Sequence, residues 1–215
     1  MNLAHLCMTI PADTSPPALV IGAVYQGGFY AGQVKISGIT YNLVISPRVS
    51  GQPDPDLLYQ INDAGFDGNT SVNDGKLIQQ NMVTFGISNF PQQQWAIAQT
   101  IGGFNDWYIP AKEELEIIYR NFKPTTSSNT TASGTNASAV PPTTAYTTTV
   151  PARTALTAFR SNGAETMTAD YYFSATQGPS GRLYAHAKRF TNGQDSEDQN
   201  VFEYPIRLVR KVVAT

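Results

Sequence analysis

Residues 102–115 constrain the fold more than any other part of this chain. They read Gly-Gly-Phe-Asn-Asp-Trp-Tyr-Ile-Pro-Ala-Lys-Glu-Glu-Leu. Paired glycines favour a tight turn, and aromatic residues alternating with isoleucine are typical of a short strand. Pro110 ends that strand, because proline cannot donate to a ladder but is tolerated in the first turn of a helix. The stretch therefore predicts a turn, an aromatic strand and a helix start in close succession.

The side chains of this stretch have separate expected roles. We expect Trp107 and Ile109 to lie in the core, and Asp106 to bond to nearby backbone in the turn. Glu113 and Glu114 fall in the first turn of the predicted helix, where the helix dipole favours negative charge. We therefore interpret them as dipole partners rather than as an acid–base pair.

Apolar periodicity and turn residues predict an α+β chain without internal repeats. Residues 19–46 are typical of a β-hairpin that turns at Ser37-Gly38. Helices are predicted at residues 76–85, 91–100, 111–122 and 151–160, and later strands at residues 170–174, 182–190 and 201–213.

The stretch at 102–115 resembles the signature G-x-x-D-W-R-L-P-T-x-x-E-L of the Lcl C-terminal-domain family. That family is related to the C-type-lectin-like fold of formylglycine-generating enzymes. The likeness is closest to a phage branch whose members continue with Y-R-N-L-K-P-T, where this chain reads Tyr-Arg-Asn-Phe-Lys-Pro-Thr at 119–125. Weaker matches lie at 27–34, 171–176 and 206–210. The matched motif positions are Gly103, Asp106, Trp107, Pro110, Glu114 and Arg207.

The resemblance implies one C-type-lectin-like domain over residues 19–215, with an N-terminal β-hairpin, short helices and antiparallel C-terminal strands. It also implies a virion protein of a phage. The chain departs from the family at Tyr172-Phe173 and at Tyr184-Ala185-His186. These departures fall on the strands where related domains place ligand contacts. The formylglycine-generating reaction is not expected, because Cys7 is the one cysteine of the chain.

Two segments stand apart in composition. Residues 1–18 contain Pro11, Pro16 and Pro17, which exclude a regular helix, and we expect them to form an arm that anchors the chain to other virion proteins. Residues 124–149 are dominated by threonine and serine. Such a composition is typical of a linker, but we expect an ordered, extended loop within the domain.

Charged residues make up only 14% of the chain, against about 25% in an average protein. The surface must then be largely uncharged and polar, which suits neutral ligands such as glycans or packing in an assembly. Nucleic acid is not expected as a partner, because phosphate binding needs clustered lysine and arginine. The N-terminus has no basic segment of a signal peptide, and no apolar stretch is long enough for membrane insertion. We expect synthesis in the host cytoplasm and assembly into the virion.

Four residues near the end of the chain are the candidate ligand contacts: Arg182, Tyr184, His186 and Lys188. Strand alternation places them on one face. Because so much charge on one face is unfavourable in a core, we expect that face to be exposed or to lie at an interface. An aromatic ring beside hydrogen-bonding groups can hold a sugar.

Core aromatic residues near these strands should instead be Phe190 and Phe202. Asp195, Glu197 and Asp198 form an acidic cluster that we expect to be a solvated loop. The other oxygen-rich loop, at 63–74, has ligand types that calcium prefers, namely Asp63, Asp67, Asn69, Asn73 and Asp74. Its spacing is not that of an EF-hand, so turn formation is the favoured interpretation, with calcium left open.

We expect no catalytic residues, cofactor or metal. A Ser-His-Asp triad would need His5 or His186, and neither stands near a nucleophile motif. Three functions are compatible with this sequence. The first is a tail-fibre or receptor-binding protein that contacts a host-surface glycan or protein. The second is a capsid, tail-decoration or baseplate component without a ligand, and the third is a glycan depolymerase. The last needs a carboxylate pair in a cleft, and the sequence nominates none. We expect a virion structural protein of the first kind, assembled as a homo-oligomer.

Overall fold

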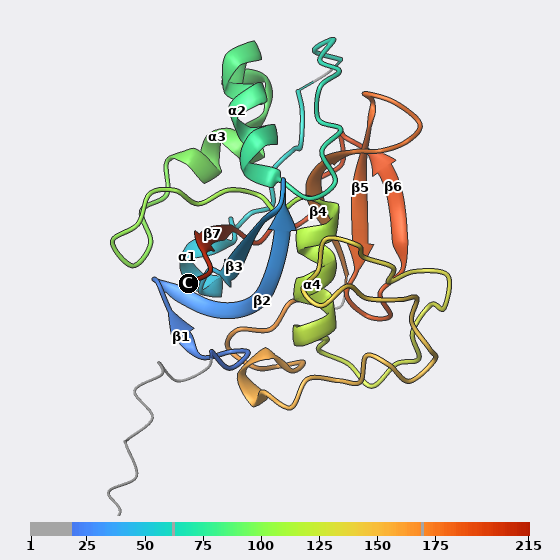
Figure 1. Cartoon of the computed structure of the whole chain (residues 1–215). Coiled ribbons are helices and arrows are strands. Elements are labelled where there is room, and N and C mark those ends of the chain that lie inside the picture. The colour runs from blue at the N-terminus through green and yellow to red at the C-terminus, as the bar shows by residue number, and fades with distance from the viewer. Residues whose placement is uncertain (1–18, 62, 169) are drawn as a thin grey trace, which may run out of the picture.

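The computed structural model describes residues 19–61, 63–168 and 170–215, so the predicted arm at 1–18 lies outside the described residues. The described chain has an α+β fold, as predicted, with short helices and two antiparallel sheets (Figure 1). Its helices are α1 (Arg48–Gly51), α2 (Gly75–Gly86), α3 (Pro91–Ile97) and α4 (Lys112–Phe122), with one-turn 3-10 helices η1 (Ile87–Asn89) and η2 (Thr157–Phe159).

The first sheet is built around the predicted N-terminal hairpin. It contains β1 (Val24–Tyr25), β2 (Gly28–Ile36), β3 (Ile39–Ile45) and β7 (Val209–Val213), in that spatial order. Ser37 and Gly38 form the turn between β2 and β3, both with positive φ, as a two-residue hairpin turn requires. The strand predicted at 201–213 is shorter than expected, since only β7 is a strand, and it pairs with β3 from Tyr41↔Val213 to Ile45↔Val209.

The second sheet has the order β4 (Tyr171–Gln177), β5 (Tyr184–Arg189) and β6 (Asp195–Gln199). Strand β6 corrects the prediction of a solvated acidic loop. It pairs with β5 in a register that places Asp195 opposite Lys188. The carboxylate of Asp195 lies 2.6 Å from the Lys188 ammonium group. The charge of Asp195 is thus neutralised within the sheet, and Glu197 accepts hydrogen bonds from the Ser180 amide and hydroxyl.

The helices predicted at 76–85, 91–100 and 111–122 are confirmed as α2, α3 and α4. The helix predicted at 151–160 is wrong, because only η2 is helical there. The Arg160 side chain donates hydrogen bonds to the carbonyl oxygens of Thr154 and Ala155 at 2.9 Å, and the Thr154 amide bonds to Lys123. The backbone of this segment is thus occupied by partners outside a helix.

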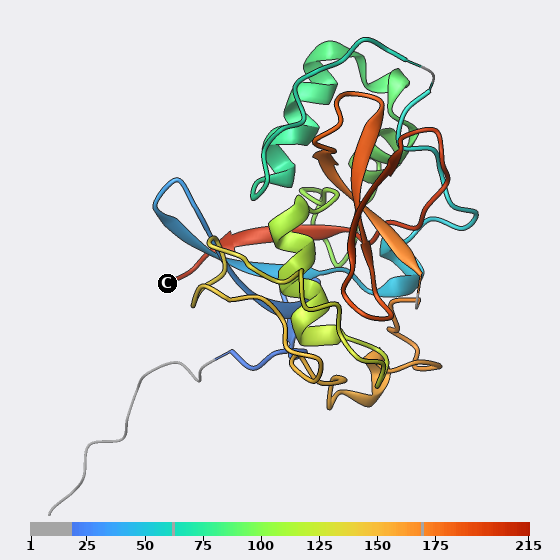
Figure 2. The same ribbon diagram turned by 90° about the vertical axis from the view of Figure 1, so that its right-hand side faces the viewer.

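Helix α4 lies between the two sheets and contacts β2, β4 and β5 (Figures 1 and 2). Its apolar side chains, including Leu115 and Ile118, belong to one buried cluster with β2, β3 and the long loop. A second buried cluster surrounds Trp107 and Ile109 and includes α2 and the opposite face of β4 and β5. Both residues are fully buried, as predicted.

Two residues, Asp106 and Phe202, differ from expectation. Asp106 does not bond to local backbone; its carboxylate pairs with the guanidinium of Arg210, with Oδ1–Nε and Oδ2–Nη2 distances of 2.7 and 3.0 Å. This pair ties the turn to β7. Phe202 was predicted in the core but is 46% exposed, whereas Phe190 is buried as expected.

Residues 124–149 run over α4 and the end of β5 as a loop with fixed anchoring points. Asn129 accepts a hydrogen bond from Tyr119 at 2.8 Å and donates to the Thr147 and Pro151 carbonyls. The Tyr146 ring packs against Tyr119, with 5.4 Å between centroids. The loop therefore contributes buried side chains to the domain.

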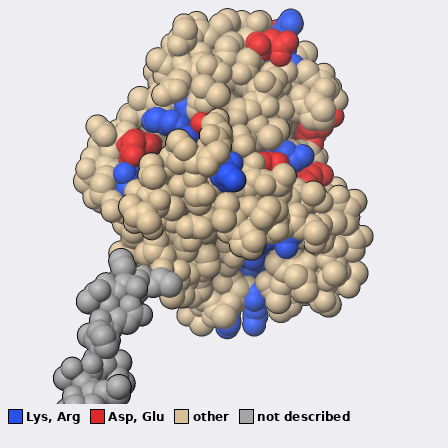
Figure 3. Space-filling model, viewed as in Figure 1, with Lys and Arg blue, Asp and Glu red and all other residues tan. Residues whose placement is uncertain are grey.

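Charged side chains on the face shown in Figure 3 are scattered in small groups among uncharged residues. This pattern agrees with the low charged fraction of the sequence. No helix within the described ranges has the length and apolar character needed to cross a bilayer.

Candidate functional site

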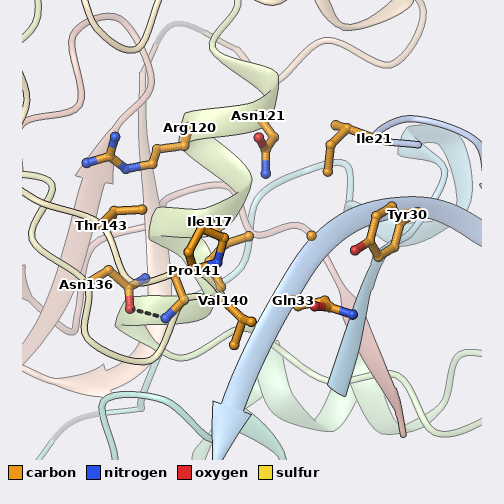
Figure 4. A pocket seen from close by; sticks show the side chains of 12 residues that line it. Ile21, Tyr30, Gln33, Ile117, Arg120, Asn121, Asn136, Val140, Pro141 and Thr143 are labelled. Carbon is orange, nitrogen blue, oxygen red and sulfur yellow. Dashed lines mark hydrogen bonds between the residues drawn. The ribbon is translucent and has the colours of Figure 1, made fainter. Parts of the chain in front are cut away.

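A pocket of about 270 Å³ lies where β2, α4 and the loop at 136–143 meet (Figure 4). Strand β2 contributes Tyr30 and Gln33, and α4 contributes Ile117 and Asn121. The loop forms the remaining wall with Asn136, Ala139, Val140, Pro141 and Thr143. The walls therefore combine apolar surface with amide and hydroxyl groups.

The floor of the pocket depends on an irregularity in β2. The register between β2 and β3 shifts between Tyr30 and Gly32, and Gly32 has a φ of +125°. A Cβ atom at Gly32 would lie 2.9 Å from Ile117 Cγ2. Because the bulge turns the Ala31 carbonyl toward α4, Asn121 Nδ2 can donate to it at 2.8 Å. Glycine here lets α4 approach the strand closely.

Asn136 fixes the loop that forms the opposite wall. Its Nδ2 donates to the Glu113 carbonyl at 2.7 Å, and its Oδ1 accepts from the amides of Ser138 and Ala139. Its backbone also exchanges two hydrogen bonds with Thr143. These five hydrogen bonds are formed in a fully buried position, so the wall is preformed.

The loop also extends the first sheet at this point. The Lys35 amide donates to the Ser138 carbonyl at 2.7 Å, and the Val140 amide donates to the Gln33 carbonyl at 3.1 Å. Residues 138–140 thus run beside β2 and close the pocket on that side.

Arg120 is the one charged residue among those that line the pocket. Its Nη2 donates to the carbonyls of Gly134 and Thr144, and its Nε lies 3.2 Å from Glu116 Oε1. The guanidinium also stacks over the Tyr146 ring at 4.9 Å. Figure 4 shows this side chain extending away from Tyr30 and Ile21, toward the loop. Arg120 therefore holds the loop in place.

The chemistry available in the pocket is binding rather than proton transfer. Among the residues that line it, none is a carboxylate, cysteine or histidine. Burial, and then the nearby Tyr25, raise the pKa of Tyr30, which keeps its phenol protonated as a hydrogen-bonding group. A neutral polar molecule with one apolar face matches these walls.

The four residues predicted to bind ligand do not share an exposed face. Tyr184, His186 and Lys188 alternate on one face of β5, but His186 and Lys188 are 4% and 1% exposed. Arg182 precedes the strand, is exposed and pairs with Asp63 through two 2.8 Å hydrogen bonds. The expectation of little core burial is therefore wrong for His186 and Lys188.

The buried face of β5 is stable because its charges are paired inside the protein. Lys188 Nζ lies 2.8 Å from Glu116 Oε2 on α4 and 2.6 Å from Asp195 Oδ1 on β6. His186 Nε2 lies 3.1 Å from the same Asp195 oxygen. Burial opposes ionisation of Asp195, but His186 and Lys188 together lower its pKa below the usual range. The Tyr146 hydroxyl donates to Glu116 and completes this network.

A serine, a histidine and an aspartate do meet in this network. Ser174 Oγ lies 3.4 Å from His186 Nδ1, whose Nε2 contacts Asp195. Ser174 is fully buried, its Oγ lies 3.2 Å from the His186 carbonyl, and it accepts from the Thr176 amide. Burial lowers the pKa of His186. The hydroxyl has no open side from which a substrate could approach, so these contacts join β4 to β5.

The side chains of the oxygen-rich loop at 63–74 contact different partners and do not converge on one point. Asp63 pairs with Arg182, which holds the pKa of that carboxyl near 2. Asp74 accepts from the Leu77 amide at the start of α2 and pairs with Lys211 at 2.6 Å. Asn69 donates to the Tyr59 hydroxyl, Asn73 to Ser138, and Asp67 accepts from Gln177. Within the described ranges, no group of three or more acidic, histidine or cysteine residues could hold a metal ion.

The matched motif positions carry structural contacts. Trp107 Nε1 donates to the Ile101 and Phe104 carbonyls, and the Pro110 carbonyl accepts from Ala175 at 2.8 Å. Gly103 lies in an exposed turn with a φ of +84°. Arg207 is fully buried, donates to the Ser46 carbonyl and pairs with Glu165 at 2.6 Å.

Glu114 of that motif lies in the first turn of α4, as predicted, but it is fully buried. Its Oε2 accepts from the amides of Gly75 and Ala111, and its Oε1 accepts from the Tyr108 hydroxyl at 2.6 Å. Burial raises the pKa of Glu114 to about 7, although these three donors oppose the effect. Glu114 thus joins α2, α4 and the aromatic segment, beyond its role at the helix dipole.

Comparisons of the chain with family models, curated proteins and solved structures return no match. The pocket residues were not nominated from the sequence. The signal available for Gly32 was the Gly-Phe-Tyr-Ala-Gly pattern in a predicted strand, where glycine often marks a bulge. No sequence signal pointed to Asn136, because it lies in a threonine- and serine-rich segment.

Proposed function

We propose that this chain is a non-enzymatic structural protein of a bacteriophage virion, built on one C-type-lectin-like domain, that contacts a host-surface glycan. The fold family and the phage origin rest on the sequence resemblance at 102–125. The α+β architecture is compatible with them. We place the glycan contact in the pocket between β2, α4 and residues 136–143, in preference to the buried face of β5.

The observation that carries this proposal is the composition of the pocket. Its polar groups are amides and hydroxyls from residues such as Gln33, Asn121 and Thr143, and its apolar surface comes from Ile117, Val140 and their neighbours. A sugar ring presents hydroxyl groups around an apolar C–H face, so it needs both kinds of wall. A volume near 270 Å³ suits a single small group rather than a long ligand.

A pair of matched variants tests this assignment. Val140 lines the pocket and is 37% exposed, whereas Val150 lies outside it in the same region and is 54% exposed; both precede a proline. The full chain is screened against an array of bacterial surface glycans, with Val140→Trp as the blocking variant and Val150→Trp as the control. Thermal unfolding of each variant shows whether it folds.

The proposal predicts that the wild type and Val150→Trp retain one glycan class, and that Val140→Trp loses it without a change in unfolding temperature. Equal binding by both variants would move the glycan contact away from this pocket. Failure of the wild type to retain any glycan would favour the other candidate, a decoration or baseplate component with no host ligand of its own.

A further inference from the structure

Three aromatic rings form a surface on the other side of the second sheet from α4. Tyr171 and Tyr204 stack with 5.9 Å between centroids and 18° between planes, and Phe202 lies 6.1 Å from Tyr204 with 32° between planes. Phe202 is 46% exposed, and both tyrosines are partly exposed. We call these three residues the aromatic platform.

The platform is presented by backbone that is firmly bonded. Glu203 forms a bridge with Leu58, and the Gln60 amide donates to the Asn200 carbonyl at 3.1 Å. Buried Gln92 donates to the Tyr204 carbonyl at 3.0 Å. These contacts hold the segment after β6 in one conformation, so the exposed rings are a preformed surface.

Carboxylates surround the platform, and none of them forms an ion pair with another residue of the described ranges. They are Asp54, Asp56, Asp170, Asp198 and Glu203. Asp170 directly precedes Tyr171, and Glu203 lies between Phe202 and Tyr204. Burial, and then the charges of Asp54, Glu203 and Asp170, raise the pKa of Asp56. Burial, and then Asp198 and Asp170, raise the pKa of Tyr204. A cation at this surface would relieve the repulsion among these carboxylates.

A hollow of about 610 Å³ adjoins this surface. It is lined by Arg48, Val49, Gln52, Pro53, Asp54, Pro55, Asp56 and Ala164, so it carries two carboxylates against one guanidinium. Val49 is 95% exposed. The walls of the hollow are mainly polar, and Asp56 connects it to Glu203 and Asp170 beside the aromatic platform.

The protein itself shows a cation on this platform. The guanidinium carbon of Arg189 lies 5.6 Å from the centroid of the Tyr171 ring. Such cation–π contacts stabilise lysine and arginine side chains on aromatic faces. Arg189 lies at the Tyr171 end, and the Phe202 ring, which is 46% exposed, is available to a further cation at the other end.

We propose that the aromatic platform and the adjoining hollow bind a lysine- or arginine-rich segment of a partner protein. Alternate side chains of an extended peptide repeat about every 6.6 Å, close to the spacing of the three rings. The chain's own residues 1–18 contain neither lysine nor arginine, so they lack the charge for this surface. This inference is independent of the glycan pocket.

The test uses fluorescein-labelled hexalysine as the probe and measures fluorescence anisotropy with the full chain at low and physiological salt. We expect binding that weakens as salt is raised. The double variant Asp56→Asn/Glu203→Gln should weaken it about tenfold, which corresponds to about 1.4 kcal/mol. Phe202→Ala should weaken it about threefold or more, as loss of a cation–π contact implies.

Two controls match these variants. Asp67→Asn removes an exposed carboxylate outside the surface, and Phe85→Ala removes a phenylalanine that is 43% exposed on α2. Both should bind hexalysine like the wild type. Asp56→Asn/Glu203→Gln should unfold at the same or a slightly higher temperature, because it removes repulsion, so lost binding could not be attributed to unfolding.

Absence of hexalysine binding at low salt would overturn the proposal, and so would equal weakening by Asp67→Asn, which would indicate attraction to net charge alone. Tight binding of a neutral oligosaccharide that Phe202→Ala abolishes, without binding of hexalysine, would also overturn it and assign the platform to sugars.

Discussion

The ammonium group of Lys188 on β5 lies 2.8 Å from Glu116 Oε2 on α4, and both side chains are almost completely buried. This contact joins the second sheet to the helix that also packs on the first sheet. Lys188 is therefore buried, although strand alternation together with its charge suggested an exposed side chain.

Removing one partner of this pair should be costly. Lys188→Met leaves Glu116 and Asp195 without their shared cation, and breaking a buried pair in this way costs about 3–5 kcal/mol. Urea unfolding should show this loss. Adding Glu116→Gln to Lys188→Met removes one of the two carboxylates that lost their cation, so this double variant should be more stable than Lys188→Met alone. A double variant that is less stable than both single variants would contradict the pairing.

The ionisation of two buried groups should make the free energy of unfolding depend on pH in opposite directions. Burial raises the pKa of Glu114 to about 7 from 4.5, so its contribution to folding is complete below pH 4.5 and is lost as the pH rises to 7. Burial lowers the pKa of His186 below 6.5, so its contribution is complete above pH 6.5 and is lost as the pH falls. The two effects follow from the linkage between proton binding and folding.

Glu114→Gln isolates the first effect. The amide oxygen can accept from Gly75 and Ala111 while the amide nitrogen faces the Tyr108 hydroxyl. Between pH 4.5 and 7, the wild type should lose on the order of 1–3 kcal/mol relative to this variant. Chemical unfolding at several pH values measures the difference. A difference that does not change with pH would show that the three hydrogen bonds fully offset burial of the charge.

The bulge beneath the pocket can be tested with two glycines. Gly38→Ala adds a methyl group where there is open space, so only the positive φ opposes it, at about 1–2 kcal/mol. Gly32→Ala also meets Ile117 at 2.9 Å, and should cost more and displace α4 from β2. Thermal unfolding compares the two, and glycan retention should fall only in Gly32→Ala. Equal costs would mean that Ile117 adapts without strain.

The sequence predicts those parts of the fold that depend on local pattern. The hairpin at Ser37-Gly38, the helices α2 to α4 and the burial of Trp107 follow from turn residues and apolar periodicity. Alternation also placed Tyr184, His186 and Lys188 on one face correctly. The burial of His186 and Lys188 could not be predicted, because Glu116, which pairs with Lys188, is far away in sequence, and Asp195, which pairs with both, was expected in a solvated loop.

The same reason accounts for the other differences. Asp106 was assigned to its own turn, but its partner Arg210 comes from a strand at the end of the chain. The pocket could not be predicted from the sequence, because its walls are formed by common residue types that come together only when the loop pairs with β2. The oxygen-rich loop, in contrast, stood out by composition, yet its side chains serve separate contacts.

The segment at 124–149 shows that a repetitive sequence can encode a fixed shape through a few positions. Asn129, Asn136 and Tyr146 are buried and bonded, while most threonines and serines of the whole segment are exposed. Substitutions at the outward positions should change what the surface presents while the course of the backbone stays the same. Evolution could therefore alter this surface one residue at a time, as long as the three fixed positions are kept.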